Sequence, residues 1–159
     1  MNIIIIGVGK IKEKFMQEGI KEYSKRLSRY CKLKILEVTD ESAPENLSKK
    51  EIEIIKEKEG KRILSKISNN SYIISLDIKG KNLSSEELSK KIEDITLGGT
   101  NDIIFIIGGS LGLSEEILNK SNLKLSFSKM TFPHQLMRMI LLEQIYRGFR
   151  IMKGEPYHR

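Results

Sequence analysis

The sequence predicts an α/β fold, with a parallel-rich sheet that carries helices on both faces. Two observations predict it. Short apolar runs alternate with helical patterns along the whole chain, and the runs at residues 3–6 and 103–107 are continuously apolar. Strands buried on both faces have such continuous runs, whereas a strand with one wet face alternates polar and apolar residues. Residues 3–6 and 103–107 are therefore expected to be central strands.

The remaining elements follow from the same periodicities. Strands are expected at residues 2–6, 33–38, 72–76, 103–107 and 123–127, and helices at 12–30, 46–67, 84–96, 114–118 and 134–152. Ser84 and Glu87 have the spacing of a capping box, which places a helix start there. Pro44 lies in a loop rather than a domain linker. The length of 159 residues fits a single domain, residues 1–159.

The composition favours a cytoplasmic protein without a metal. There is one cysteine, Cys31, no signal-peptide pattern, and no apolar run near the roughly 18 residues that a membrane span needs. Two histidines and one cysteine lie far apart in the sequence, so we expect no zinc site. Cys31 is expected to be a packed thiol.

Positive charge is concentrated near the N-terminus. The net charge is +7, and residues 10–34 hold nine Lys or Arg against three Glu. Lys21, Lys25 and Arg29 form a helical stripe that suits a phosphate backbone, although a solvated face fits equally well. The opposite, apolar face is expected to contain Phe15, Ile20, Tyr23 and Leu27. A second basic cluster at the C-terminus favours RNA as the partner.

The last helix is apolar around nearly its whole circumference. Its apolar residues are Leu136, Met137, Met139, Ile140, Leu141, Leu142 and Ile145. A terminal helix of a small domain usually keeps one wet face, so we expect this helix to make a homodimer contact.

Two nucleotide-binding motifs can be excluded. Gly7 and Gly9 resemble the start of a dinucleotide fingerprint, but Lys12 stands where the third glycine belongs. These glycines are expected to form a tight turn between a strand and a helix. No phosphate-binding loop of the Walker type is present.

Three strand ends carry the residues of a candidate binding pocket: Leu76-Asp77 with Gly80-Lys81, the glycine-rich residues 108–112, and residues 127–134. Glycines after a buried strand let backbone groups approach a ligand, and ligands of open α/β sheets bind at the carboxyl ends of strands. A pocket lined mostly by backbone suits adenine and ribose.

These motifs together closely resemble the ribosomal RNA large subunit methyltransferase H family, which belongs to the trefoil-knotted SPOUT class. The matching segments are Leu76-Asp77-x-x-Gly80-Lys81, Ile107-Gly108-Gly109-x-x-Gly112-Leu113-Ser114, Thr131-x-Pro133-His134 and the terminal Pro156-Tyr157-His158-Arg159. The similarity runs from the first strand to the last residue. It implies a C-terminal deep trefoil knot, an exception to the rule against knotted chains.

The resemblance also implies an activity. It implies S-adenosylmethionine-dependent methylation of N3 of pseudouridine 1915 in helix 69 of 23S rRNA, by a homodimer that acts on assembled ribosomes. The cofactor-binding residues would be Leu76, Gly108, Phe127, Ser128, Lys129, Met130, Thr131 and Phe132.

The groups available for catalysis are His134, Arg138, Tyr157, His158 and Arg159. By hypothesis His158, or a water that it orients, accepts the N3 proton, the arginines stabilise negative charge or hold phosphate, and Tyr157 contacts the flipped base. Simpler roles stay open: His134 could start the helix, and Arg138 could pair with a carboxylate such as Glu143. For Arg147 and Arg150, helix stabilisation and RNA contact are equally compatible.

Two other functions remain open. One is a SPOUT methyltransferase that acts on tRNA or on a ribose 2′-hydroxyl. The other is a basic ribosome-binding module that keeps the fold without catalysis.

Overall fold

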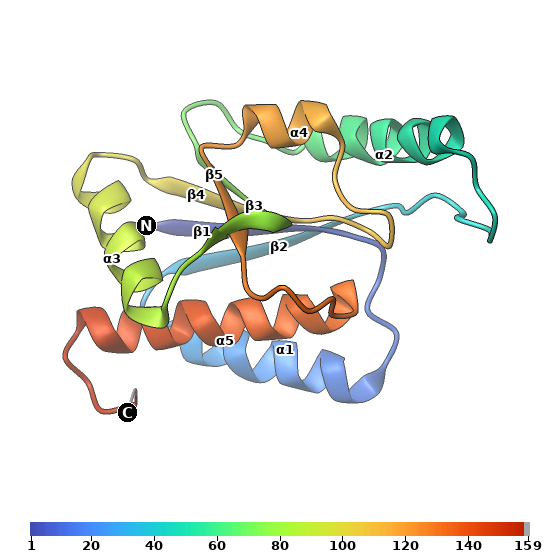
Figure 1. Ribbon diagram of the computed structural model, residues 1–159. Coiled ribbons are helices and arrows are strands. Elements are labelled where there is room, and N and C mark those ends of the chain that lie inside the picture. The colour runs from blue at the N-terminus through green and yellow to red at the C-terminus, as the bar shows by residue number, and fades with distance from the viewer. Residues whose placement is uncertain (158–159) are drawn as a thin grey trace.

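Five parallel strands form one sheet in the order β2-β1-β4-β3-β5. The computed structural model describes residues 1–157 (Figure 1). The strands are β1 (Asn2–Val8), β2 (Lys32–Val38), β3 (Tyr72–Asn82), β4 (Asp102–Ile107) and β5 (Leu123–Ser126). The helices are α1 (Lys14–Leu27), α2 (Lys49–Leu64), α3 (Ser85–Leu97), α4 (Glu115–Lys120) and α5 (His134–Met152).

The two continuously apolar runs form central strands, as predicted. β1 lies between β2 and β4, and β4 lies between β1 and β3. Ile3, Ile5, Ile104 and Phe105 have no exposed surface. Central strands need apolar residues on both faces because helices cover both faces.

Helices lie on both faces of the sheet, which confirms the predicted α/β class. Figure 1 shows α2 and α4 on one face and α1, α3 and α5 on the other. Alternate β1 residues reach the two cores: Ile3 and Ile5 pack with Leu141 and Ile145 of α5, whereas Ile6 packs with Ile63 of α2.

The apolar stripe of α1 differs from the prediction. Phe15 is 62% exposed, so its expected place in the apolar face is wrong. The stripe consists of Met16, Ile20, Tyr23 and Leu27. Their spacing of four, three and four residues keeps one face of a helix inward, and Phe15 lies about 100° away from Met16 around the axis.

Helix α5 packs along α1 and α3 on its face of the sheet (Figure 1). Leu141, Leu142 and Ile145 are buried in the core, whereas Leu136, Met139 and Ile140 are only half-buried. The capping box at the start of α3 is confirmed, because the Ser84 hydroxyl accepts from the Glu87 N–H while the Glu87 carboxylate accepts from the Ser84 N–H. The trefoil knot and the homodimer stay predictions.

Between residues 1 and 157, every helix is too short or too polar to cross a bilayer.

Candidate active site

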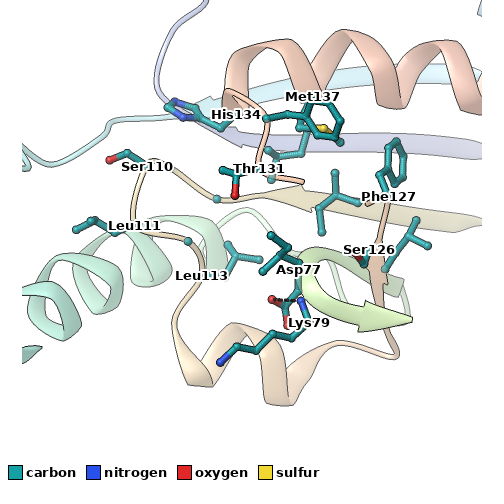
Figure 2. Close-up of a pocket in the computed structure, with 18 of the residues that line it drawn as sticks. Asp77, Lys79, Ser110, Leu111, Leu113, Ser126, Phe127, Thr131, His134 and Met137 are labelled. Atoms are coloured by element: carbon teal, nitrogen blue, oxygen red, sulfur yellow. Dashed lines mark hydrogen bonds between the residues drawn. The ribbon is translucent and has the colours of Figure 1, made fainter. Parts of the chain in front are cut away.

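A cavity of about 810 Å³ opens at the carboxyl ends of β3, β4 and β5. Figure 2 shows side chains from these three strand ends and from the start of α5 around it. Its lining contains Leu76, Gly108, Phe127, Ser128, Met130, Thr131, Phe132 and His134. The three strand ends that the sequence predicted to meet therefore do meet in one cavity.

The wall from β3 is an outward excursion of the strand. Leu76 pairs with Leu125 of β5, and Lys81 pairs with the same residue, so residues 77–80 leave the ladder between them. The Asp77 carboxylate accepts from the Lys79 N–H at 3.3 Å (Figure 2). Gly80 is required here, because a Cβ atom would lie 2.6 Å from the Lys124 carbonyl oxygen. This bulge turns Asp77 and its neighbours toward the cavity.

The floor is the glycine turn of residues 108–112, after β4. Gly109 accepts from the Gly112 N–H at 3.1 Å, and Gly112 has a φ of +88°. A Cβ atom on Gly108 would lie 2.9 Å from the Gly112 carbonyl carbon. The turn can therefore close only without a side chain at Gly108, which leaves backbone groups to line the cavity.

The third wall is the loop between β5 and α5. The Ser128 hydroxyl accepts from the Met130 N–H at 3.0 Å, and the Ser126 hydroxyl donates to the Ser128 carbonyl at 3.1 Å. These bonds fold residues 126–132 into a compact loop. Met130 is 74% exposed and Phe132 is 36% exposed, although both line the cavity. Lys129 is exposed and lies outside the lining.

His134 begins α5 and also lines the cavity. Its side chain is half-buried, and burial lowers the pKa of the imidazole, assisted by the nearby charge of Arg138 and opposed by Asp40. His134 is therefore neutral at neutral pH. A neutral imidazole can accept a proton or donate one hydrogen bond.

Arg138 lies beneath the end of β1, outside the cavity lining. It is 2% exposed, and its guanidinium donates to Glu37 at 2.6 Å and to the Gly9 carbonyl oxygen at 3.2 Å. A Cβ atom on Gly7 would lie 2.3 Å from the guanidinium, so a larger residue there would have to displace the head group of Arg138. The carboxylate partner is thus Glu37 on β2 rather than Glu143, which sequence spacing could not have revealed.

The C-terminal tail folds back along α5. The chain reverses at Gly154, which has a φ of +63°, and the Tyr157 hydroxyl donates to Glu143 at 3.1 Å. Burial foremost, and then Glu143, raise the pKa of Tyr157 to about 12. The Arg147 guanidinium stacks over the Tyr157 ring at 4.6 Å. His158 and Arg159 lie outside the described residues.

A second set of contacts anchors the tail one residue after the reversal. The Glu155 carboxylate accepts from the Tyr30 hydroxyl at 2.5 Å and also pairs with Arg150. Arg150 donates in addition to the Pro156 carbonyl at 3.0 Å. Tyr157 and the cavity residues are not brought together within this chain: the tail lies at the other end of α5 from His134 (Figure 1).

Sequence reasoning missed Glu59. This α2 residue is 5% exposed, its carboxylate accepts from the Glu41 N–H at 3.0 Å, and a Cβ atom on Gly109 would lie 3.2 Å from it. The next residue, Gly60, packs against Ser114 at the far end of the glycine turn. Glu59 and Gly60 thus support both ends of the turn. An acidic residue in a helix full of exposed charges gives no sequence signal of this position.

Within residues 1–157, no three His, Cys, Asp or Glu side chains gather as a metal site requires.

The chain with this fold and this cavity is a SPOUT-class methyltransferase, because it matches a model of that family. The family described as predicted SPOUT methyltransferase matches residues 1–158. A probable methylase family protein from Haemophilus influenzae Rd KW20 has a similar fold, with a TM-score of 0.53 at 11% identity over 99% of this chain and 70% of that one.

Two relatives show which family of the SPOUT class the chain belongs to. A protein of Clostridioides difficile (strain 630), named ribosomal RNA large subunit methyltransferase H, is 64% identical over 100% of both chains. The protein of that name from Clostridium botulinum (strain Okra / Type B1) is 65% identical over 100% of both chains. The chain belongs to the ribosomal RNA large subunit methyltransferase H family.

Proposed function

We propose that this protein is an S-adenosylmethionine-dependent methyltransferase that methylates N3 of pseudouridine 1915 in helix 69 of 23S rRNA, on assembled ribosomes. The observation that carries the proposal is the cavity at the ends of β3, β4 and β5 in a chain of this family. We infer further that residues 1–159 act as one domain, and that the protein works in the cytoplasm, where its ribosomal substrate is.

The cavity fits the proposed cofactor. Its volume of about 810 Å³ is within the range of small-molecule sites, and its walls combine apolar side chains with backbone groups. Leu76, Gly108 and the loop residues Phe127, Ser128, Met130, Thr131 and Phe132 would hold the adenosine part; Lys129 would contribute only through its backbone. When bound, S-adenosylmethionine supplies an electrophilic methyl group on a sulfonium.

The residues of the site must position the base and take up one proton. Methylation would require the base to be held with N3 toward the bound methyl donor, and it would release the N3 proton. His134 is the described group best placed for that proton, because it lines the cavity and is neutral at neutral pH. His158 remains the alternative acceptor. Arg138 would act through His134 and the β1 end, since its guanidinium is already paired.

The tail would supply the acceptor half of the site. Tyr157 is fixed by Glu143 and Arg147, and His158 and Arg159 follow it. Within one chain the Tyr157 hydroxyl lies at Glu143, nine residues after His134, which is roughly 14 Å along α5 at about 1.5 Å per residue. We therefore infer a homodimer in which the tail of one protomer completes the cavity of its partner.

The experiment compares 23S rRNA from cells that lack the protein with rRNA from cells that also express it. Mass spectrometry should find N3-methylpseudouridine only in the second. Gly108→Val should fail to restore it and should abolish cofactor binding in calorimetry, because the turn cannot close around a side chain. A methyl group gained by tRNA or by a ribose hydroxyl would replace the proposed substrate. Binding to ribosomes without any methyl transfer would favour the non-catalytic module.

A matched control for Gly108→Val is Gly148→Ala. Gly148 lies inside α5, and a Cβ atom there would be 3.6 Å from Ser89, an ordinary contact. This variant should bind the cofactor as the wild type does.

A further inference from the structure

A second cavity, of about 360 Å³, adjoins the proposed cofactor cavity. Leu125, Phe127 and Phe132 line both cavities, so the two cavities adjoin along these side chains. The other side of the second cavity is formed by the start of α3 and by Ile140 and Gln144 of α5. A group held there would lie directly beside whatever the first cavity binds.

The residues that line the second cavity suit a flat ring with hydrogen-bonding groups along its edge. Two phenylalanines and four aliphatic side chains, Leu83, Leu88, Leu125 and Ile140, supply apolar surface. Phe132 is 36% exposed, so one aromatic side chain is accessible for stacking. Proteins hold splayed-out RNA bases by stacking on aromatic side chains and by hydrogen bonds to the base edges.

Gln144 provides the hydrogen-bonding edge. Its amide oxygen accepts from the Ser85 hydroxyl at 2.6 Å, and its amide nitrogen donates to Glu143 at 2.7 Å. A glutamine amide has two N–H donors and two acceptor lone pairs. Among contacts within residues 1–157, one N–H donor and one lone pair of the Gln144 amide are therefore still available.

The same hydrogen-bond chain reaches the tail. One carboxylate oxygen of Glu143 accepts a hydrogen bond from the Gln144 amide. The other accepts hydrogen bonds from Arg147 and from the Tyr157 hydroxyl. Glu143 thus holds the Gln144 amide in place and also binds the tail of the same chain.

We propose that the second cavity binds the acceptor base, and that Gln144 recognises its N1–H and C2=O groups. The inference rests on the proposed function and specifies how the substrate is selected. Pseudouridine is attached to ribose through carbon, so its N1 carries a hydrogen that uridine lacks. A glutamine that accepts from N1–H and donates to O2 selects pseudouridine and leaves N3 free to face the first cavity. N3 would there receive the methyl group of the bound donor, and His134, which lines that cavity, would take up the N3 proton.

The test measures methyl transfer to ribosomes that carry either pseudouridine or uridine at the target position. The wild type should prefer pseudouridine, and Gln144→Ala should reduce that preference roughly tenfold, the loss expected for one bidentate base contact. Cofactor affinity, measured by calorimetry, should stay within about twofold of the wild type, because Gln144 lies outside the first cavity. A purely structural role of Gln144 would lower transfer to both substrates equally.

Two further variants sharpen the result. Ser85→Leu places a larger side chain in the second cavity and should abolish transfer to both substrates while the cofactor still binds. Gln17→Ala removes an exposed glutamine of α1 and should change neither the preference nor the rate.

The outcomes separate the inference from the proposed function. If the wild type methylates neither substrate, the proposed function fails and the inference falls with it. If the wild type prefers pseudouridine and Gln144→Ala keeps that preference, the inference alone is overturned. It is also overturned if Ser85→Leu remains active, or if Gln144→Ala changes the oligomeric state instead, which would make this cavity a contact between copies of the chain.

Discussion

Glu59 illustrates how a residue outside the cavity lining can control the cavity. Its carboxylate is nearly fully buried, against Gly109 and the Glu41 N–H. Burial raises the pKa of Glu59, and the charges of Asp40 and Glu41 act in the same direction, whereas the Glu41 N–H bond and Arg62 oppose it. The folded state therefore favours the neutral form of the Glu59 carboxyl. Ionisation of this group, which packs against the glycine turn, is costly.

We expect Glu59→Gln to make the protein more stable at alkaline pH. Because the folded-state pKa lies above that of the unfolded chain, the stability that the neutral acid contributes is lost as pH rises through the folded-state pKa. Glutamine keeps an acceptor for the Glu41 N–H and cannot ionise. The gain in melting temperature should be smallest near about pH 4 and largest near about pH 8, with about 2–4 °C for each kcal/mol.

The control for this prediction is Glu57→Gln, which removes an exposed carboxylate from the same helix. Its melting temperature should follow that of the wild type at every pH. A Glu59→Gln variant that is destabilised equally across the pH range would mean that the carboxylate is held by contacts that an amide cannot replace.

At the scale of elements, the sequence predicted each helix and strand, but not the details that depend on distant partners. The signals that located these elements are local in the sequence: the capping box located the start of α3, and the continuous apolar run located β4. The extension of β3 to Asn82 was missed, because it depends on pairing with β5 on both sides of a bulge. The Glu37 partner of Arg138 was missed for the same reason, since the two residues are 101 positions apart.

The C-terminal tail is an element that the sequence indicated only by composition. Terminal segments are usually poorly ordered unless they are tied down. Here Glu155 is tied to Tyr30 and Arg150, and Tyr157 is tied to Glu143 and packs edge-on against Tyr146 at 4.9 Å. These contacts give the residues after Pro156 a defined starting point on α5.

Deleting residues 157–159 should abolish methyl transfer, because it removes the acceptor half of the site. Cofactor affinity should stay within about twofold of the wild type, since none of the cavity lining is lost. Single-turnover methylation and calorimetry measure the two effects separately.

The partial variant Tyr30→Phe removes only the hydroxyl that holds Glu155. The same hydroxyl also accepts from Arg150 at 3.1 Å, so the variant loses two hydrogen bonds to charged groups. Each costs about 1.5–3 kcal/mol, so the tail should loosen and the rate should fall without being abolished. Full activity of the deletion variant would exclude the tail from the mechanism.

At the scale of the whole molecule, the arrangement of surfaces favours two copies acting together. His134, which lines the proposed cofactor cavity, begins α5, whereas the C-terminal tail follows the other end of that helix (Figure 1). Several apolar residues of α1 and α5 also remain accessible: Phe15 is 62% exposed, and Leu136 and Met139 are half-buried. Gly19, one helical turn after Phe15, packs against Met139. These accessible residues are therefore expected to form one continuous apolar surface.

Phe15→Glu should weaken the homodimer at least about tenfold, because burying an unpaired carboxylate in an apolar contact is costly. The fold should survive, since Phe15 is largely exposed in the single chain. Sedimentation velocity over a range of concentrations would measure the shift from dimer to monomer.

Leu97→Glu is the matched control: it changes an apolar residue that is 78% exposed at the end of α3, and it should leave the dimer intact. If the tail of one protomer completes the cavity of its partner, methyl transfer by Phe15→Glu should fall in proportion to the dimer fraction while calorimetry still detects cofactor binding. A wild type that sediments as a single chain and still methylates would overturn the shared site, and a fully dimeric Phe15→Glu would place the interface on another surface.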